Sequence, residues 1–376
     1  MVMAVLADGI NMPPQQIPSF TLRDFRSGRY GKNQLSQYLI PENSVANSLN
    51  INFDEIVGSA KVRPGTTKLG DTVAEGQTPL GLSPFVGPSG IPDFLLAVFS
   101  GTTDGTLYYF DVVDSAWHES FPGLGTWSNV EKNRFAILGG SIFITNSVDG
   151  MKDSTDADTW GTTNSIDTYF PSLVFRYKAR LLAAGDSTFP DRVFFSSIVS
   201  PASSPIITWN TDDTTGDWVD INPDDGGSIT GFSESSTFCL VFKDTGMYRL
   251  DTVSKSVDVE NIYDVGAISQ EGIVLCQGTT YFFSGRDIRR TNGGYPEQIS
   301  RPVQDFVDAI PKTNWTSVAA GTDKLNVYFS IGDVTVDRRD YTNVWLKFSV
   351  RDQSWSVHSY AGDFKMFATF ITTINT

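Results

Sequence analysis

The sequence predicts an all-β protein: a β-propeller of six to eight four-stranded blades, of which we expect seven, with an extended N-terminal arm. Two segments share one pattern, in which a tryptophan follows a strand-like aromatic run. Leu107 to Asp111 precedes Trp117, and Trp345 to Ser349 precedes Trp355. Short strands that recur every ~40 to 50 residues are typical of propeller blades.

A weaker third copy sets the spacing of this repeat. It runs from Met247 to Asp251 and has Val257 in place of the tryptophan. The central residues of the three copies, Phe110, Leu250 and Phe348, are 140 and 98 positions apart. These separations divide into three steps of about 47 residues and two of about 49, which is the length of a blade.

The composition favours the same fold class. The chain of 376 residues contains 33 Gly, 18 Pro and 12% aromatic residues, as expected of strands broken by tight turns. Helical spacing of apolar residues occurs only from Arg301 to Ile310. Radial repetition lets one domain reach this length, so we expect a single propeller domain over residues 46–376.

Residues 1–45 differ from the rest and predict the extended arm. This segment is rich in Pro, Gln and Ser, shows no sustained periodicity, and places tyrosines among basic residues. We expect it to pack on its own domain or on a neighbouring subunit, the alternative being an exposed terminus without a partner. The residues expected to contact a partner or another copy are Arg23, Phe25, Arg26, Arg29, Tyr30 and Tyr38.

Each predicted blade centres on two apolar strands joined by a turn. Six such pairs follow in order, at residues 94–110, 134–145, 180–196, 237–250, 273–289 and 324–348. We expect the insertions at 201–225 and 331–342 to be surface loops. A hairpin predicted at 47–62 would pair with the C-terminal strands, including 364–374, as a seventh blade, because an open ring leaves strand edges unpaired.

Charge and cysteine content limit the possible functions. The net charge of −15 is unsuited to a surface that grips nucleic acid, although an acidic wall would let DNA pass without binding and would equally keep a protein soluble. Cys239 and Cys276 lie in apolar runs, which favours buried thiols over a disulfide. The N-terminus is a poor signal peptide, and the longest apolar run, 94–99, is too short for a membrane anchor.

The sequence contains no recognisable catalytic motif. Its two histidines, His118 and His358, each follow a repeated tryptophan, which favours structural roles in separate blades over one shared Ser-His-Asp site. Glycine-rich phosphate motifs and zinc-ligand spacing are missing from the sequence. We therefore expect no enzymatic activity, no cofactor and no metal.

Some polar and aromatic residues leave alternatives open. Residues 154–160 are similar to the Asp-box turn of sialidases but lack its glycine and spacing, so a carbohydrate-binding or sialidase-like propeller is the alternative function. Repeated tryptophans could stack on sugars, but their fixed place in each repeat favours packing between blades. Loop carboxylates could hold Ca²⁺, although a solvated turn is favoured because EF-hand spacing is missing. These carboxylates are Asp212, Asp213, Asp217, Asp220, Asp224 and Asp225.

Three motifs lie near the N-terminus: DFRSG at 24–28, LIPENSVANSLN at 39–50 and VRPGT at 62–66. They resemble the start of the β-propeller structural proteins of tailed bacteriophages, a group that includes tail nozzle, neck and head-tail connector proteins. The resemblance covers about residues 24–66, agrees more loosely over the blades, and carries no catalytic residues.

This resemblance implies a non-enzymatic virion protein, assembled in the host bacterial cytoplasm into an oligomeric tail or neck ring that conducts or retains DNA. Its partners would be other tail or neck proteins and copies of itself. Genomic DNA would pass through the lumen without sequence-specific binding. A generic interaction scaffold is a third hypothesis.

Overall fold

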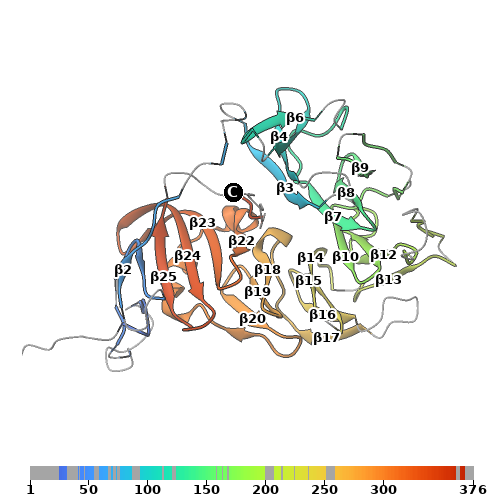
Figure 1. The fold of residues 1–376 in the computed structure, drawn as a ribbon. Helices are drawn as coiled ribbons and strands as arrows, with labels where there is room; N and C mark the ends of the chain where they lie inside the picture. The colour runs from blue at the N-terminus through green and yellow to red at the C-terminus, as the bar shows by residue number, and fades with distance from the viewer. Residues whose placement is uncertain are drawn as a thin grey trace, which may run out of the picture.

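Six small antiparallel sheets surround a central axis in the computed structural model, which confirms the all-β propeller (Figure 1). Five sheets have four strands and one has three. The structure describes residues 25–31, 41, 43–45, 47–54, 59–66, 69–70, 73, 77–86, 94–111, 114–120, 124–157, 159–162, 164–166, 169–199, 207–212, 215–223, 225–235, 237–250, 259–360 and 365–368.

Blades 1 to 3 form the first half of the ring. Blade 1 comprises β3 (Pro79–Phe85), β4 (Phe94–Ser100), β5 (Gly105–Asp111) and β6 (Ala116–Glu119). Blade 2 comprises β7 (Arg134–Leu138), β8 (Ser141–Asn146) and β9 (Gly150–Ser154), with an isolated bridge from Asp153 to Gly161 at its outer edge. Blade 3 comprises β10 (Leu173–Tyr177), β11 (Arg180–Ala184), β12 (Arg192–Phe195) and β13 (Trp218–Asp220).

Blades 4 to 6 form the second half of the propeller. Blade 4 comprises β14 (Ile229–Glu234), β15 (Cys239–Lys243), β16 (Met247–Leu250) and β17 (Val259–Tyr263). Blade 5 comprises the 3-10 helix η2 (Gln270–Gly272), β18 (Ile273–Cys276), β19 (Thr279–Phe283), β20 (Ile288–Thr291) and β21 (Glu297–Gln298). The helices η3 (Arg301–Val303), α1 (Gln304–Asp308) and η4 (Lys312–Ser317) lead to blade 6, which comprises β22 (Ala319–Thr322), β23 (Asn326–Val336), β24 (Arg339–Ser349) and β25 (Trp355–Ser359).

The aromatic repeat is a cross-strand pair at the outer edge of a blade. Phe110 faces Trp117 across β5 and β6, and Phe348 faces Trp355 across β24 and β25. Their ring centroids are 5.4 Å and 5.0 Å apart, within the range of favourable aromatic pairs. In the third copy the partner of Leu250 is Val259 rather than the expected Val257, which lies outside the described residues.

All six expected strand pairs fall in separate sheets, but the expected count of seven blades is not confirmed. The predicted hairpin forms as β1 (Ile51–Asn52) and β2 (Lys61–Val62), and it lies along β25 at the outer edge of blade 6. Residues 365–368 lie against blade 6, where the Phe367 ring packs on Gly321 of β22 and is 4.9 Å from the Trp345 ring. Residues 369–374 of the expected C-terminal strand are outside the described part of the chain.

The expectation of a surface loop at 331–342 is wrong. These residues extend β23 and β24 into one long hairpin, because Val334 and Val336 alternate with polar residues and are buried in the same apolar cluster as Phe306 of α1. The predicted helical stretch does form, as η3 followed by α1. Cys239 and Cys276 are buried and unpaired, as predicted.

Candidate interaction surface

The described part of the N-terminal arm packs on blade 6 of its own propeller. The Arg29 amide donates to the Trp355 carbonyl at 3.0 Å, and the Tyr30 amide donates to the Val45 carbonyl at 2.9 Å. Gly28 has a φ of +63°, and a Cβ there would lie 2.8 Å from the Trp355 oxygen. Only glycine combines this backbone conformation with so close an approach.

Arg29 is buried beneath this contact, with 3% of its surface exposed. Its guanidinium forms a bidentate ion pair with Asp305 at 2.9 and 2.5 Å, donates to the Pro302 carbonyl, and lies 4.6 Å from the centre of the Phe306 ring. The side chain is therefore engaged within its own chain, and not on a surface where a partner could reach it.

The other arm residues expected to make contacts have different positions. Phe25 and Tyr30 are half-buried, and Arg26 is exposed. Arg23 and Tyr38 lie outside the described residues. Among the described members of the expected set, Tyr30 lines a groove at the rim of the propeller.

A second set of contacts fastens the hairpin to blade 6. The Lys347 ammonium is 2.8 Å from both carboxylate oxygens of Asp54. Arg63 donates to the side chain of Asn50 at 2.9 Å and to the Ser359 carbonyl at 2.8 Å. Gly28, Asn50 and Arg63, which lie in the motifs that carry the N-terminal resemblance, thus hold the N-terminal segment on blade 6. We call the contacts that residues 28–30, 50–54 and 63 make with blade 6 the clasp.

His358 lies under the clasp, with 2% of its surface exposed and opposite Trp345 in the sheet. Burial, together with the nearby cations Lys347 and Arg63, lowers the pKa of His358 to about 4. The imidazole is therefore neutral at pH 7. Protonation would place a third positive charge beside two others in a buried space.

The groove beside Tyr30 has a volume of about 640 Å³ and lies where blade 5 meets β17 and β25. It combines tyrosines with arginines, and we call it the arginine groove. Its main lining residues are Tyr30, Tyr263, Arg289, Arg290, Tyr295 and Arg301. Sequence reasoning missed all of these except Tyr30; four arginines between 286 and 301 were the available signal.

The arginines of the groove are held in different ways. Asp287 binds Arg289 through two hydrogen bonds of 2.9 and 2.7 Å, and Glu297 binds Arg290 at 2.9 Å. Arg301 is exposed, and no described residue forms an ion pair with it. Tyr295 is 73% exposed and packs edge-on against Tyr263 at 4.6 Å. The groove is an ordered surface with one uncompensated cation.

The central axis is crossed by an ion cluster that joins opposite sides of the ring. Glu271, which precedes β18 in blade 5, is 2.6 Å from Arg134 of blade 2 and 3.3 Å from Lys132. Burial alone would raise the pKa of Glu271, but Arg134 and Lys132 outweigh it and hold the pKa below its usual value. A carboxylate that stays ionised between two cations links blades 2 and 5 through ion pairs. It has no proton to donate as a general acid.

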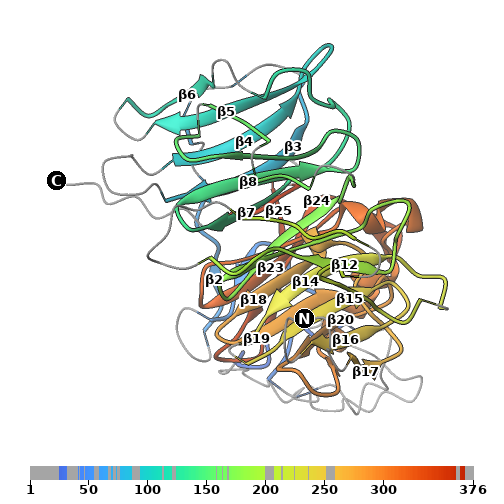
Figure 2. The ribbon, with the colours of Figure 1, turned by 90° about the vertical axis from the view of Figure 1, so that its right-hand side faces the viewer.

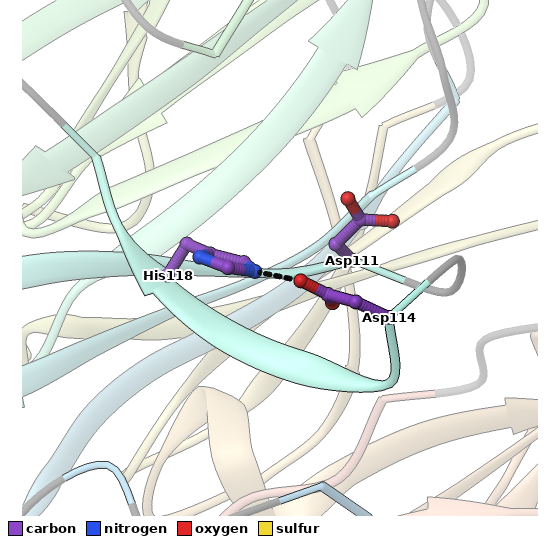
Figure 3. Close-up of side chains that lie close together, drawn as sticks. All are labelled: Asp111, Asp114 and His118. Carbon is purple, nitrogen blue, oxygen red and sulfur yellow. Dashed lines mark hydrogen bonds and ion pairs between the residues drawn. The ribbon is translucent and has the colours of Figure 1, made fainter.

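His118 lies in the outer hairpin of blade 1 (Figure 3), whereas His358 lies in β25 of blade 6. Its Nε2 is 2.7 Å from Asp114, whose second oxygen accepts from the Ala116 amide. Asp111 lies beside them, and one ligand atom from each of the three residues falls within 4.8 Å of the others. The two histidines therefore belong to different blades and cannot act on one substrate.

Two carboxylates of the acidic loop of blade 3 are bound by protein cations. Asp225 binds the fully buried Lys243 at 2.6 Å, and Asp220 binds Arg192 at 2.8 Å. Burial would raise the pKa of Asp225, but Lys243 and hydrogen bonds lower it to about 2. Within the described residues the loop carboxylates do not gather as a metal-ligand cluster, and Asp213 and Asp224 are outside that part.

The tryptophans serve mainly in packing. Trp355 is 1% exposed and its indole donates to the Ile299 carbonyl, which joins blades 5 and 6. Trp218 stacks on Arg192 at 3.5 Å, and Trp117 packs on Phe99 and Phe110 while staying partly exposed. Residues 154–157 form a turn in which the Ala157 amide donates to Ser154, with Ala157 at a φ of +62°.

No family model matches this chain, and no curated protein matches it. Solved structures resemble the chain at low identity. A computationally designed protein, Ika8, is 10% identical, covers 78% of this chain and 100% of its own, and has a TM-score of 0.42. The β-propeller domain of Cps50 (Swd1) from Myceliophthora thermophila is 12% identical, covers 77% and 100%, and has a TM-score of 0.39. YCF48 from Cyanidioschyzon merolae is 10% identical, covers 75% and 87%, and has a TM-score of 0.43.

The helices in the described part of the chain are all too short or too polar to cross a membrane.

Replacing Arg29 tests the clasp. Arg29→Ala leaves the Asp305 carboxylate buried without its cation, which typically costs about 3–5 kcal/mol of unfolding free energy. Urea denaturation followed by tryptophan fluorescence measures the loss. The matched control, Arg338→Ala in the exposed turn between β23 and β24, should change stability by less than about 0.5 kcal/mol. A cost for Arg29→Ala as small as the control's would contradict the assigned role.

The buried imidazole predicts a defined pH dependence. The pKa of His358 falls from 6.5 in the unfolded chain to about 4 in the folded one, so the unfolded chain takes up the proton first as pH falls. Stability should decline between about pH 6.5 and pH 4, by roughly 3 kcal/mol in total. Urea midpoints across this range should flatten in His358→Gln, whereas the exposed-turn variant Arg338→Ala should keep the wild-type profile. An unchanged profile in His358→Gln would refute this origin.

Proposed function

We propose that this chain is a non-enzymatic structural protein of a tailed-bacteriophage virion. It forms part of an oligomeric ring in the tail or neck that conducts or retains DNA. The observation that carries the proposal is the clasp. Residues of the phage-like segment, including Gly28, Asn50 and Arg63, fasten the N-terminus to the last blade and make no catalytic arrangement.

The charges of the described residues support a structural role over a chemical one. Glu271 at the axis is bound by Arg134 and Lys132. In the blade 3 loop, Lys243 binds Asp225 and Arg192 binds Asp220. The acidic net charge suits a wall that DNA passes without adhering. The carbohydrate-binding alternative predicted charged and aromatic groups converging on an open central pocket. The described charged groups that converge at the axis, Glu271, Arg134 and Lys132, instead form ion pairs with one another.

Mass spectrometry of purified virions of the phage that encodes this chain tests the proposal. We expect the chain in several copies per particle, and antibody labelling should place it on the tail or neck in electron micrographs. The major capsid protein supplies the copy-number standard. A chain that is made during infection but is missing from particles would contradict the virion role, and glycan binding or glycosidase turnover would then favour the alternative.

A further inference from the structure

We propose that residues 365–368 are a strap across the junction of the last blade with the first, and that release of the Phe367 ring opens a cavity at the propeller axis. The inference concerns the fold of a single copy, so it is independent of the proposed virion role. We call this cavity, which has a volume of about 230 Å³, the axial cavity.

The axial cavity lies where the first and last blades meet. Its wall includes Leu82 and Ser83 of β3 in blade 1, Ala320 of β22 in blade 6, and Met366 and Phe367 of the strap. Blade 5 also contributes, through η2 and β18, although it lies across the ring from blade 1 (Figures 1 and 2). A cavity with walls on opposite sides of the ring is at its axis.

The junction of blades 6 and 1 is built with help from the strap. The other junctions between consecutive blades are formed by their inner strands, which pack on one another from β3 round to β22. Between β22 and β3 the strap is part of the cavity wall as well. The strap therefore takes part in closing the ring.

The Phe367 side chain occupies a socket that depends on a glycine. A Cβ on Gly321 of β22 would lie 2.4 Å from Cγ and 2.5 Å from Cβ of Phe367. The Phe367 ring also packs edge-on against the Trp345 ring. Because Cβ and Cγ are at the root of the side chain, rotating the ring would not make room for a methyl group. Glycine at residue 321 is thus what lets the strap dock.

The Phe367 ring also separates the axial cavity from a neighbouring groove. That groove has a volume of about 390 Å³, and its wall includes Phe367, Ala368, Tyr328 and Trp345. Since Phe367 belongs to the walls of both spaces, withdrawal of its ring would join them. Small solutes could then pass from the groove to the axis, where Glu271 and its ion-pair partners lie.

The strap is suited to local opening because it is not part of a sheet. Its four residues are half-buried and lie outside the strands. Backbone hydrogen bonds do not join residues 366–368 to any other residue that the structure describes. Segments held by side-chain packing open at a free-energy cost well below that of global unfolding. The strap can therefore open while the blades remain folded.

A thiol placed in the axial cavity measures this opening. Ser83→Cys puts the thiol in the cavity wall, and the native Cys239 and Cys276 are buried. The introduced thiol should react with iodoacetamide at least about tenfold faster when Gly321→Ala or Phe367→Ala is added, because the strap then no longer closes the cavity. Peptide mass spectrometry of samples quenched over time gives the rates.

Gly294→Ala is the matched control, because a Cβ at this exposed glycine meets nothing within 4 Å. Adding it to Ser83→Cys should leave the rate unchanged. Amide hydrogen exchange in the two strap variants should become faster at β3 and β22, while β10 to β12 of blade 3 keep their protection. Circular dichroism verifies that every variant is folded.

Three results would overturn the proposal. The first is a reaction rate in both strap variants equal to that of the control. The second is a thiol in Ser83→Cys alone that reacts as fast as one in an unfolded peptide, because the cavity would then never be closed. The third is a loss of protection in β10 to β12 together with β3 and β22, which would make the strap a general stabiliser. None of these results bears on the virion role, which the composition of particles tests.

Discussion

The hydrogen bonds that join the N-terminal arm to the outer strand of blade 6 are the contact on which the rest of the structure depends. An outer propeller strand leaves a row of backbone groups without partners, and such edges invite aggregation. Here the Trp355 carbonyl accepts from Arg29 and the Val357 carbonyl accepts from Asn50. Residues about 300 positions earlier in the sequence therefore supply hydrogen-bond donors to this outer strand.

The buried charges explain why the arm holds this position. Arg29 and Asp305 would each be costly to bury alone, and their bidentate geometry offsets that cost only when the arm is docked. Lys347 and Asp54 do the same for the hairpin. The neutral His358 between Lys347 and Arg63 avoids a third cation in this space. The clasp is thus specific in its geometry, and it places Tyr30 in the wall of the arginine groove.

The local pattern of apolar and aromatic residues predicted the strand pairs of the blades. It could not predict which distant parts of the chain pair with each other. The spacing from Phe110 to Trp117 and from Phe348 to Trp355 identified two outer hairpins, because register and period act within a few residues. The expected seventh blade required the hairpin at 47–62 to pair with the C-terminal strands. The periodicity of a sequence does not encode such pairing between its two ends. Arg29 was expected at an interface because basic residues are usually exposed. Its partner Asp305 lies 276 positions away, beyond any local signal.

The N-terminal arm is an integral part of blade 6, and amide hydrogen exchange is the measurement that tests this. In the wild type, peptides covering 25–31 and 355–359 should be protected to a similar degree. Arg29→Ala should speed their exchange together by more than about tenfold while β10 to β12 of blade 3 keep their protection. Wild-type exchange at 25–31 as fast as in an unstructured peptide would contradict the claim.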